Sequence, residues 1–98
     1  MNQPPAYRQA VTVKSPTGLH LRPISLIVET VRKSGCEVTV GKGAQTVQAD
    51  NILDLMTLNA GHGTVLELEA HGERAGEVVE QLVRLFESNF EEGGTPEA

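Results

Sequence analysis

The stretch VTVKSPTGLHLRPISLIV, residues 11–28, changes its pattern of apolar residues halfway along. Its first part alternates apolar and polar side chains, which is typical of a strand with one buried face. Residues 15–18 are turn formers, and beyond them the apolar residues recur at helical spacing as far as the stop signal Ser34-Gly35. The stretch therefore predicts a strand over 10–14, a turn, and a helix that begins near Leu21.

The rest of the chain continues to alternate between strand-like and helix-like patterns. The further segments with strand-like alternation are 36–40, 45–49 and 64–70. A glycine-rich turn at 41–44 indicates that the first two of these form a hairpin. Asp50-Asn51 is expected to cap a short helix over 52–58. A C-terminal helix is predicted by the apolar stripe Val78, Val79, Leu82, Val83, Phe86 and Phe90.

Each predicted strand has one apolar side and one polar side. The side chains expected to point inward are Val11, Val13, Cys36, Val38, Val40, Val47, Ala49, Leu66, Leu68 and Ala70. Those expected to face water are Thr12, Lys14, Glu37, Thr39, Gln48, Glu67 and Glu69. A sheet with a single apolar face needs helices on that face only. The order βαββαβα thus predicts an α+β fold with a largely antiparallel sheet covered on one side.

Length and composition exclude several classes of protein. The 98 residues are enough for one domain, and no apolar run approaches the roughly 20 residues that span a bilayer. We therefore expect no membrane insertion. Cys36 is the sole cysteine, so no internal disulfide is possible and a cytoplasmic location is expected. A net charge of −5 and three aromatic residues argue against nucleic-acid binding.

The two ends of the chain are expected to lie outside the folded domain. Residues 1–7 are interpreted as a disordered N-terminal arm, and residues 91–98 are acidic and rich in Gly and Pro, as in a flexible tail. The domain itself is expected over residues 8–90.

His20 lies where the first helix is predicted to begin. Pro23 is tolerated in a first helical turn, where backbone N–H groups such as those of Leu21 and Arg22 lack intrahelical acceptors. Those amides and the Arg22 guanidinium suit an anion such as a phosphoryl group, and the imidazole is a nucleophile. The residues alone leave two interpretations open: a phosphoryl-accepting site, or an ordinary helix end with a solvated arginine.

Three features together resemble a known family. They are the motif GLHLRP at 18–23, the segment ILDLMTL at 52–58 and the closing amphipathic helix. They resemble HPr, the histidine-containing phosphocarrier family of the bacterial phosphoenolpyruvate-dependent phosphotransferase system, over about residues 8–90. The resemblance implies an open-faced sandwich in which three helices cover one face of a four-stranded antiparallel sheet.

The resemblance also implies a function for the histidine motif. His20 would accept a phosphoryl group on ring nitrogen Nδ1 from phosphorylated enzyme I and pass it to an enzyme IIA component, without a metal or cofactor. Arg22 would be the phosphate partner. The protein would then be a substrate of phosphotransferases and not itself an enzyme. Transient transfer through an exposed site predicts a monomer.

Two positions depart from the family pattern. Leu21 stands where alanine usually follows the histidine, and Asn51 stands where many members carry a serine phosphorylated by a regulatory kinase. Asparagine caps a helix well but cannot be phosphorylated, so we expect no regulatory serine here. These departures, with Asp54, keep a second function open: a regulatory HPr-like module whose His20 phosphorylation state controls a target protein.

The predicted helix at 52–58 is apolar nearly all round. Ile52, Leu55 and Met56 can share a core-facing side, while Leu53 and Leu58 are apolar as well. By resemblance, part of this surface binds partners, and the docking residues are expected to be Leu21, Ile52, Leu53, Asp54 and Met56. The alternative is that all the apolar residues of the segment pack inside. Because partners in this system tend to present acidic surfaces, Asp50 and Asp54 put the usual pairing in doubt.

Other chemistry has little support in the sequence. The spacing of His62, His71, Cys36 and His20 matches no zinc signature, so no metal site is expected. A small hydrolase would need a general base or a water-positioning set near His20, and the sequence supplies neither.

Overall fold

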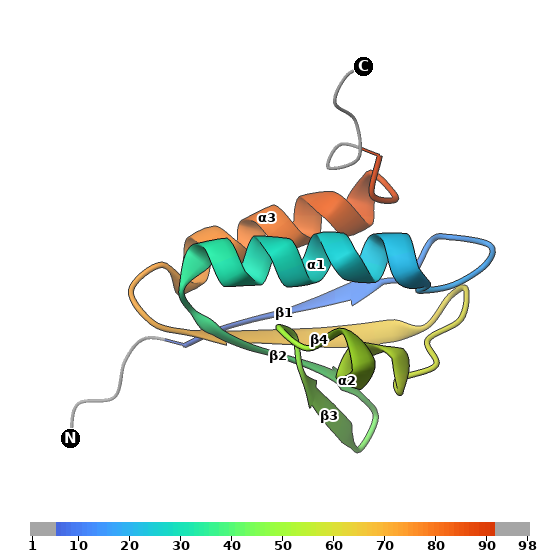
Figure 1. Ribbon diagram of the computed structural model, residues 1–98, viewed down its shortest axis with the longest axis horizontal. Coiled ribbons are helices and arrows are strands. Elements are labelled where there is room, and N and C mark those ends of the chain that lie inside the picture. Colours follow the sequence, from blue (N-terminus) through green and yellow to red (C-terminus); the bar gives the residue numbers. More distant parts are fainter. Residues whose placement is uncertain (1–5, 92–98) are drawn as a thin grey trace.

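The computed structural model describes residues 6–91, in which strands and helices follow the predicted order (Figure 1). The strands are β1 (Ala6–Thr12), β2 (Glu37–Lys42), β3 (Gln45–Gln48) and β4 (Val65–His71). The helices are α1 (Leu21–Ser34), α2 (Ile52–Met56) and α3 (Ala75–Glu87). No helix among these residues is long and apolar enough to cross a bilayer.

The four strands form one antiparallel sheet in the order β1-β4-β2-β3. The register aligns apolar residues of neighbouring strands, so that Leu66 lies opposite Val11 and Leu68 lies opposite Val40. In Figure 1, α1 and α3 lie side by side over one face of the sheet, and α2 lies near β3. The predicted open-faced α+β sandwich is confirmed.

The core lies between the apolar face of the sheet and the helices. Of the side chains predicted to point inward, those buried are Val11, Val13, Val38, Val40, Ala49, Leu66, Leu68 and Ala70. Cys36 and Val47 are only partly buried, although both pack against the core. Cys36 precedes β2 and Val47 lies in the edge strand β3, where fewer neighbours cover a side chain.

β1 begins earlier than predicted because residues before the alternating segment also pair with β4. The prediction of 10–14 followed the alternation, whereas β1 pairs with β4 from Ala6, opposite His71, to Thr12, opposite Val65. The predicted arm over 1–7 is therefore wrong at residues 6 and 7, which belong to the sheet. Residues 1–5 of that arm, and residues 92–98 of the predicted tail, lie outside the described residues.

Two other segments differ from their predicted bounds. The turn predicted at 41–44 is confined to residues 43–44, because Gly41 and Lys42 pair with β3. α2 ends at Met56, and a turn in which the Leu58 N–H donates to the Leu55 carbonyl at 3.2 Å follows it.

Phe90 belongs to the predicted apolar stripe but not to α3, which ends at Glu87. The chain takes a left-handed backbone conformation at Asn89 and Phe90, with φ of 57° and 64°. This turn returns the buried Phe90 ring to the core, where it meets Phe86 edge-on at a centroid distance of 4.9 Å. The stripe therefore identified a core residue correctly and placed it in the wrong element.

Asn51 caps α2 as predicted, since its Oδ1 accepts a hydrogen bond from the Asp54 N–H at 3.1 Å. Replacing such a cap by alanine costs about 1 kcal/mol. We expect Asn51→Ala to lower the free energy of unfolding by about this amount in urea titrations. Asn51→Asp, which keeps an acceptor, should stay within about 0.5 kcal/mol of the wild type. Equal losses in the two variants would contradict the capping role.

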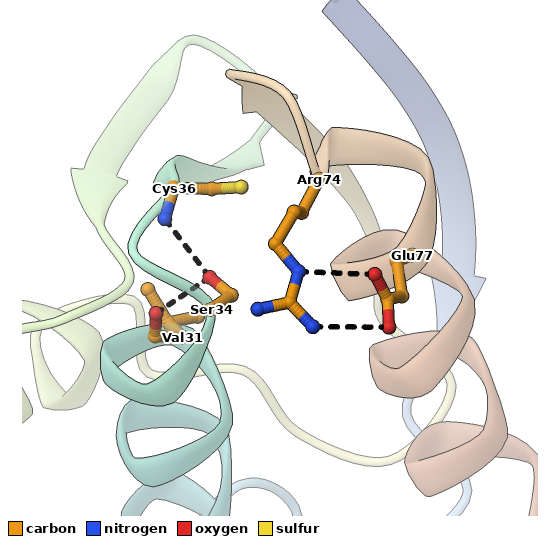
Figure 2. A network of polar contacts seen from close by, with 5 residues as sticks. All are labelled: Val31, Ser34, Cys36, Arg74 and Glu77. Atoms are coloured by element: carbon orange, nitrogen blue, oxygen red, sulfur yellow. Dashed lines mark hydrogen bonds and ion pairs between the residues drawn. The ribbon is translucent and has the colours of Figure 1, made fainter.

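The end of α1 far from His20 contacts the start of α3. Ser34 Oγ donates to the Val31 carbonyl at 2.7 Å and accepts from the Cys36 N–H at 3.0 Å. Across from it, Arg74 Nε lies 3.1 Å from Glu77 Oε1 (Figure 2). The hydrogen bond and the charge of Arg74 hold the pKa of the Glu77 carboxyl below its ordinary value.

The Arg74–Glu77 pair predicts a pH dependence of stability at acidic pH. Since the pKa of Glu77 is lower in the folded than in the unfolded chain, its contribution is present above the unfolded pKa and is lost as the pH falls through the folded one. We expect Glu77→Gln to lose less stability than the wild type between about pH 5 and about pH 3. Glu80→Gln, on the same helix and without an ion pair among residues 6–91, is the control and should follow the wild type.

Candidate functional site

The turn between β1 and α1 is held by short polar side chains. Ser15 Oγ lies 3.0 Å from Thr17 Oγ1 and accepts from the Thr17 N–H at 3.3 Å. The Ser15 carbonyl accepts from the Gly18 N–H at 3.0 Å, and Ser15 is itself buried. The turn formers found in the sequence therefore make a closed loop that directs the chain into α1.

Gly18 is required at the next position for two reasons. Its φ of +78° is left-handed, a conformation that costs an L-residue roughly 1–2 kcal/mol. A Cβ atom there would also lie 2.6 Å from the carbonyl oxygen of Ala60. That same carbonyl accepts from the Leu19 N–H at 2.8 Å, so the loop after α2 lies against the turn that carries the histidine.

His20 is the N-cap of α1, as predicted. Its backbone is extended, with φ of −127° and ψ of −169°, and its carbonyl accepts from the Ile24 N–H at 3.0 Å. The imidazole makes no capping hydrogen bond and is exposed. The backbone thus fixes the residue at the helix start, and within residues 6–91 the exposed ring takes part in no hydrogen bond.

The first turn of α1 offers donors without acceptors. Within residues 6–91 no hydrogen bond occupies the backbone N–H of Leu21 or Arg22, and Pro23 has no N–H to satisfy. The first turn contains no acidic residue. An anion beside His20 would meet these amides and the positive end of the helix dipole.

Arg22 is exposed and makes no ion pair or hydrogen bond with its side chain in the described part of the chain. His20 and Arg22 are therefore brought into one helical turn but not into mutual contact. A guanidinium without a partner retains all its donors for the oxygens of an incoming phosphoryl group.

The docking residues predicted around α2 divide into exposed and buried side chains. Leu53 is 74% exposed and Met56 51% exposed, and Leu21 on α1 is 59% exposed. These three residues are called the apolar strip below. Ile52 is only partly buried and packs against the core, and Asp54 is half-buried.

The alternative in which all the apolar residues of 52–58 pack inside is therefore wrong. Leu55 and Leu58, three residues apart on one side of the segment, fill the core position. Met56, which could have shared the core-facing side but was also among the expected docking residues, is exposed. A helix of little more than one turn has room for only one buried side.

α2 packs along α1 in the opposite direction. At one end, the loop after α2 bonds to Leu19 through Ala60, next to His20. At the other end, Arg32 Nη2 donates to the Asp50 carbonyl at 3.2 Å. Since α1 rises about 1.5 Å per residue, the surface from Leu21 to Arg32 is about 16 Å long. Within α2, Met56 is nearer than Leu53 to the end that bonds to Leu19 beside His20.

The other predicted residues lie outside any chemical cluster. Among residues 6–91, no group of three or more His, Cys, Asp or Glu side chains is arranged to hold a metal ion. His71 is 2.9 Å from Glu69 on the sheet, and His62 is exposed in the loop after α2. Sequence reasoning missed the supporting role of Ala60, because a backbone carbonyl leaves no signal in the residue type.

The chain is thus a small open-faced α+β sandwich with an exposed histidine at the start of its first helix, and comparison with known proteins gives its family. The family model described as the PTS HPr component phosphorylation site matches residues 7–88. The phosphocarrier protein HPr of Pseudomonas aeruginosa is 34% identical over 84 residues, which is 85% of this chain and 93% of that protein. The chain belongs to the HPr family of phosphotransferase-system phosphocarriers.

Solved structures of the family show the same fold. HPr from Thermoanaerobacter tengcongensis superposes with a TM-score of 0.82 at 36% identity, over 86% of this chain and 94% of that one. Crh, a catabolite-repression protein of Bacillus subtilis, superposes at 0.66 with 33% identity, over 84% and 93% of the two chains. That Crh structure is described as a domain-swapped dimer.

Proposed function

We propose that this protein accepts a phosphoryl group on His20 from phosphorylated enzyme I and passes it to an enzyme IIA component. The observation that carries the proposal is the exposed imidazole at the start of α1, close in the chain to two amides and an Arg22 side chain that have no hydrogen-bond or ion-pair partner among residues 6–91. We further propose that the protein acts in the cytoplasm as a monomer, since a brief encounter with each partner needs one open surface.

The transfer step moves one phosphoryl group between two nucleophiles. The lone pair of His20 Nδ1 attacks phosphorus in line with its bond to the donor, and that bond breaks as the P–N bond forms. The electron pair of the broken bond returns to the donor, so no water or cofactor is consumed. The reverse sequence at an enzyme IIA nucleophile empties His20 again.

Arg22 and the Leu21 and Arg22 amides would bind the phosphoryl oxygens. All three are solvent-facing donors on one side of the group, so they stabilise the charge without enclosing it. An open site of this kind keeps the phosphorus accessible to the next nucleophile. A fully enclosed anion site would slow release.

The test is phosphorylation of the purified chain by phosphoenolpyruvate and enzyme I from the same genome. We expect an acid-labile, alkali-stable adduct on His20, which then disappears when the matching enzyme IIA is added. A wild-type chain that stays unmodified under conditions where enzyme I itself is phosphorylated would overturn the proposal. Release of inorganic phosphate without any acceptor would point to a hydrolase.

A second candidate is a regulatory module whose His20 phosphorylation state controls a target protein. The observations that favour it are Leu21 and Asn51 in place of the residues usual in the family, and the similarity to Crh. The same assay separates the two: a transport carrier discharges to enzyme IIA, whereas a regulatory module keeps its phosphoryl group when enzyme IIA is added.

A further inference from the structure

Two carboxylates border the apolar strip, and neither has a charged partner among residues 6–91. Asp50 is exposed just before α2, and Asp54 is half-buried in its first turn. The Asp54 N–H donates to Asn51 Oδ1, and the Asp54 carbonyl accepts from Thr57 Oγ1. Its carboxylate makes no ion pair or hydrogen bond among residues 6–91. The α2 side of the docking surface is therefore negatively charged.

Two cations that contact the ends of the α2 segment bind backbone oxygens, and within residues 6–91 neither forms an ion pair with Asp50 or Asp54. Arg32 donates to the carbonyl of Asp50, not to its carboxylate. Lys42 Nζ donates to the Leu58 and Asn59 carbonyls at 2.8 and 3.2 Å, at the opposite end of α2. Among residues 6–91, Arg32 and Lys42 thus provide hydrogen bonds for the two ends of α2, and the carboxylates of Asp50 and Asp54 keep their acceptors for a partner.

Phosphorylation makes this surface more negative. A phosphoryl group on His20 carries about −1.5 to −2 charges at neutral pH, which Arg22 offsets only in part. A partner that receives the group approaches the phosphoryl charge at one end of the surface and the two carboxylates along α2. Like charges placed opposite one another cost affinity and slow association, whereas opposite charges speed it.

We propose that the protein partner of this chain docks an apolar contact on Leu53 and Met56 and presents Lys or Arg side chains opposite Asp50 and Asp54. The inference rests on the proposed function and specifies the chemistry of the partner. It is the reverse of the acidic docking surface that the family resemblance implies. It also predicts poor transfer to phosphotransferase components whose docking surfaces are acidic.

The test measures phosphotransfer with enzyme I or enzyme IIA of the same genome, and compares the wild-type chain with variants at Asp50 and Asp54. Asp50→Asn/Asp54→Asn removes the two proposed ion pairs with the partner, so the concentration for half-saturation should rise about threefold to tenfold at about 0.1 M salt. Asp50→Lys/Asp54→Lys should raise it at least about tenfold, because attraction becomes repulsion. At about 1 M salt, where the Debye length is about 3 Å, the variants and the wild type should converge.

The matched control is Glu73→Lys/Glu80→Lys, which changes the net charge equally. These glutamates are exposed and lie toward β1, at the sheet edge opposite the one that α2 contacts. This control should transfer at the wild-type half-saturation concentration. Circular dichroism of each variant shows whether the helices are retained. Asp50→Asn/Asp54→Asn removes the charges with a smaller change of side chain, so it separates an effect on docking from loss of α2.

Each outcome decides the matter. An unchanged or lower half-saturation concentration in the lysine variant would overturn the inference while leaving the proposed function intact. A monomer–dimer equilibrium of the chain alone that the same variant abolishes would assign the strip to a second copy and overturn it too. Failure of enzyme I to phosphorylate wild-type His20 would instead overturn the proposed function, and the inference with it.

Discussion

His20→Ala is expected to abolish phosphorylation by enzyme I and phosphoenolpyruvate. The variant lacks the attacking nitrogen, and no other residue at the start of α1 can replace it, since Arg22 is cationic and Leu21 is apolar. We expect the rate of adduct formation to fall by at least about three orders of magnitude. The measurement is radiolabel or intact mass after acid-free workup, with the fold verified by circular dichroism.

His62→Ala is the matched control for this result. His62 is also exposed and lies in the loop that bonds to the turn before His20, yet it is neither at a helix start nor beside Arg22. The control should be phosphorylated at the wild-type rate. An adduct that persists in His20→Ala and is lost in His62→Ala would place the acceptor in that loop and refute the assignment of His20.

Gly18→Ala is expected to cause the largest loss of stability among the single changes considered for this loop. The new Cβ would need a left-handed backbone and would lie 2.6 Å from the Ala60 carbonyl oxygen and 3.0 Å from the Gly61 Cα atom. These contacts are to backbone, which cannot move aside as a flexible side chain does. Overpacking of this kind typically costs about 1–3 kcal/mol beyond the conformational penalty.

Gly35→Ala separates the two contributions. Gly35 ends α1 with φ of +71°, nearly the value at Gly18, but a Cβ there meets nothing within 4 Å. Gly35→Ala should therefore show the conformational penalty alone, about 1–2 kcal/mol, in urea unfolding. Equal losses in the two variants would show that the Ala60 contact adds nothing. Slower phosphorylation of Gly18→Ala at a temperature where it remains folded would show that the turn also positions His20.

Phe90 shows what periodicity captures and what it misses. Its apolar character correctly predicted burial, because burial depends mainly on the residue itself. The left-handed turn that brings it back depends on where α3 ends against β1 and β4, which no local pattern records. The early start of β1 has the same cause, since residues 6–9 join the sheet through pairing with a distant strand.

Met56 and Leu53 show the same limit at the candidate site. The sequence could indicate that α2 has too many apolar residues for its size, but it allowed Met56 both a core-facing side and a place among the docking residues, and Met56 lies outside. Which side of so short a helix faces the core is decided by Lys42, Arg32 and the loop at Ala60, which hold its ends from other elements.

By itself, the order of residues determined the succession of strands and helices, the apolar face of the sheet, and the place of His20 at the start of the first helix. These depend on turn formers, alternation and helical spacing, which act between near neighbours in the chain. Only the tertiary structure decided that the β1–α1 turn packs on Ala60 and that Leu21, Leu53 and Met56 are exposed. The contact between Leu19 and Ala60 joins residues far apart in the chain, and the exposure of a side chain is fixed only after the sheet and helices have packed together.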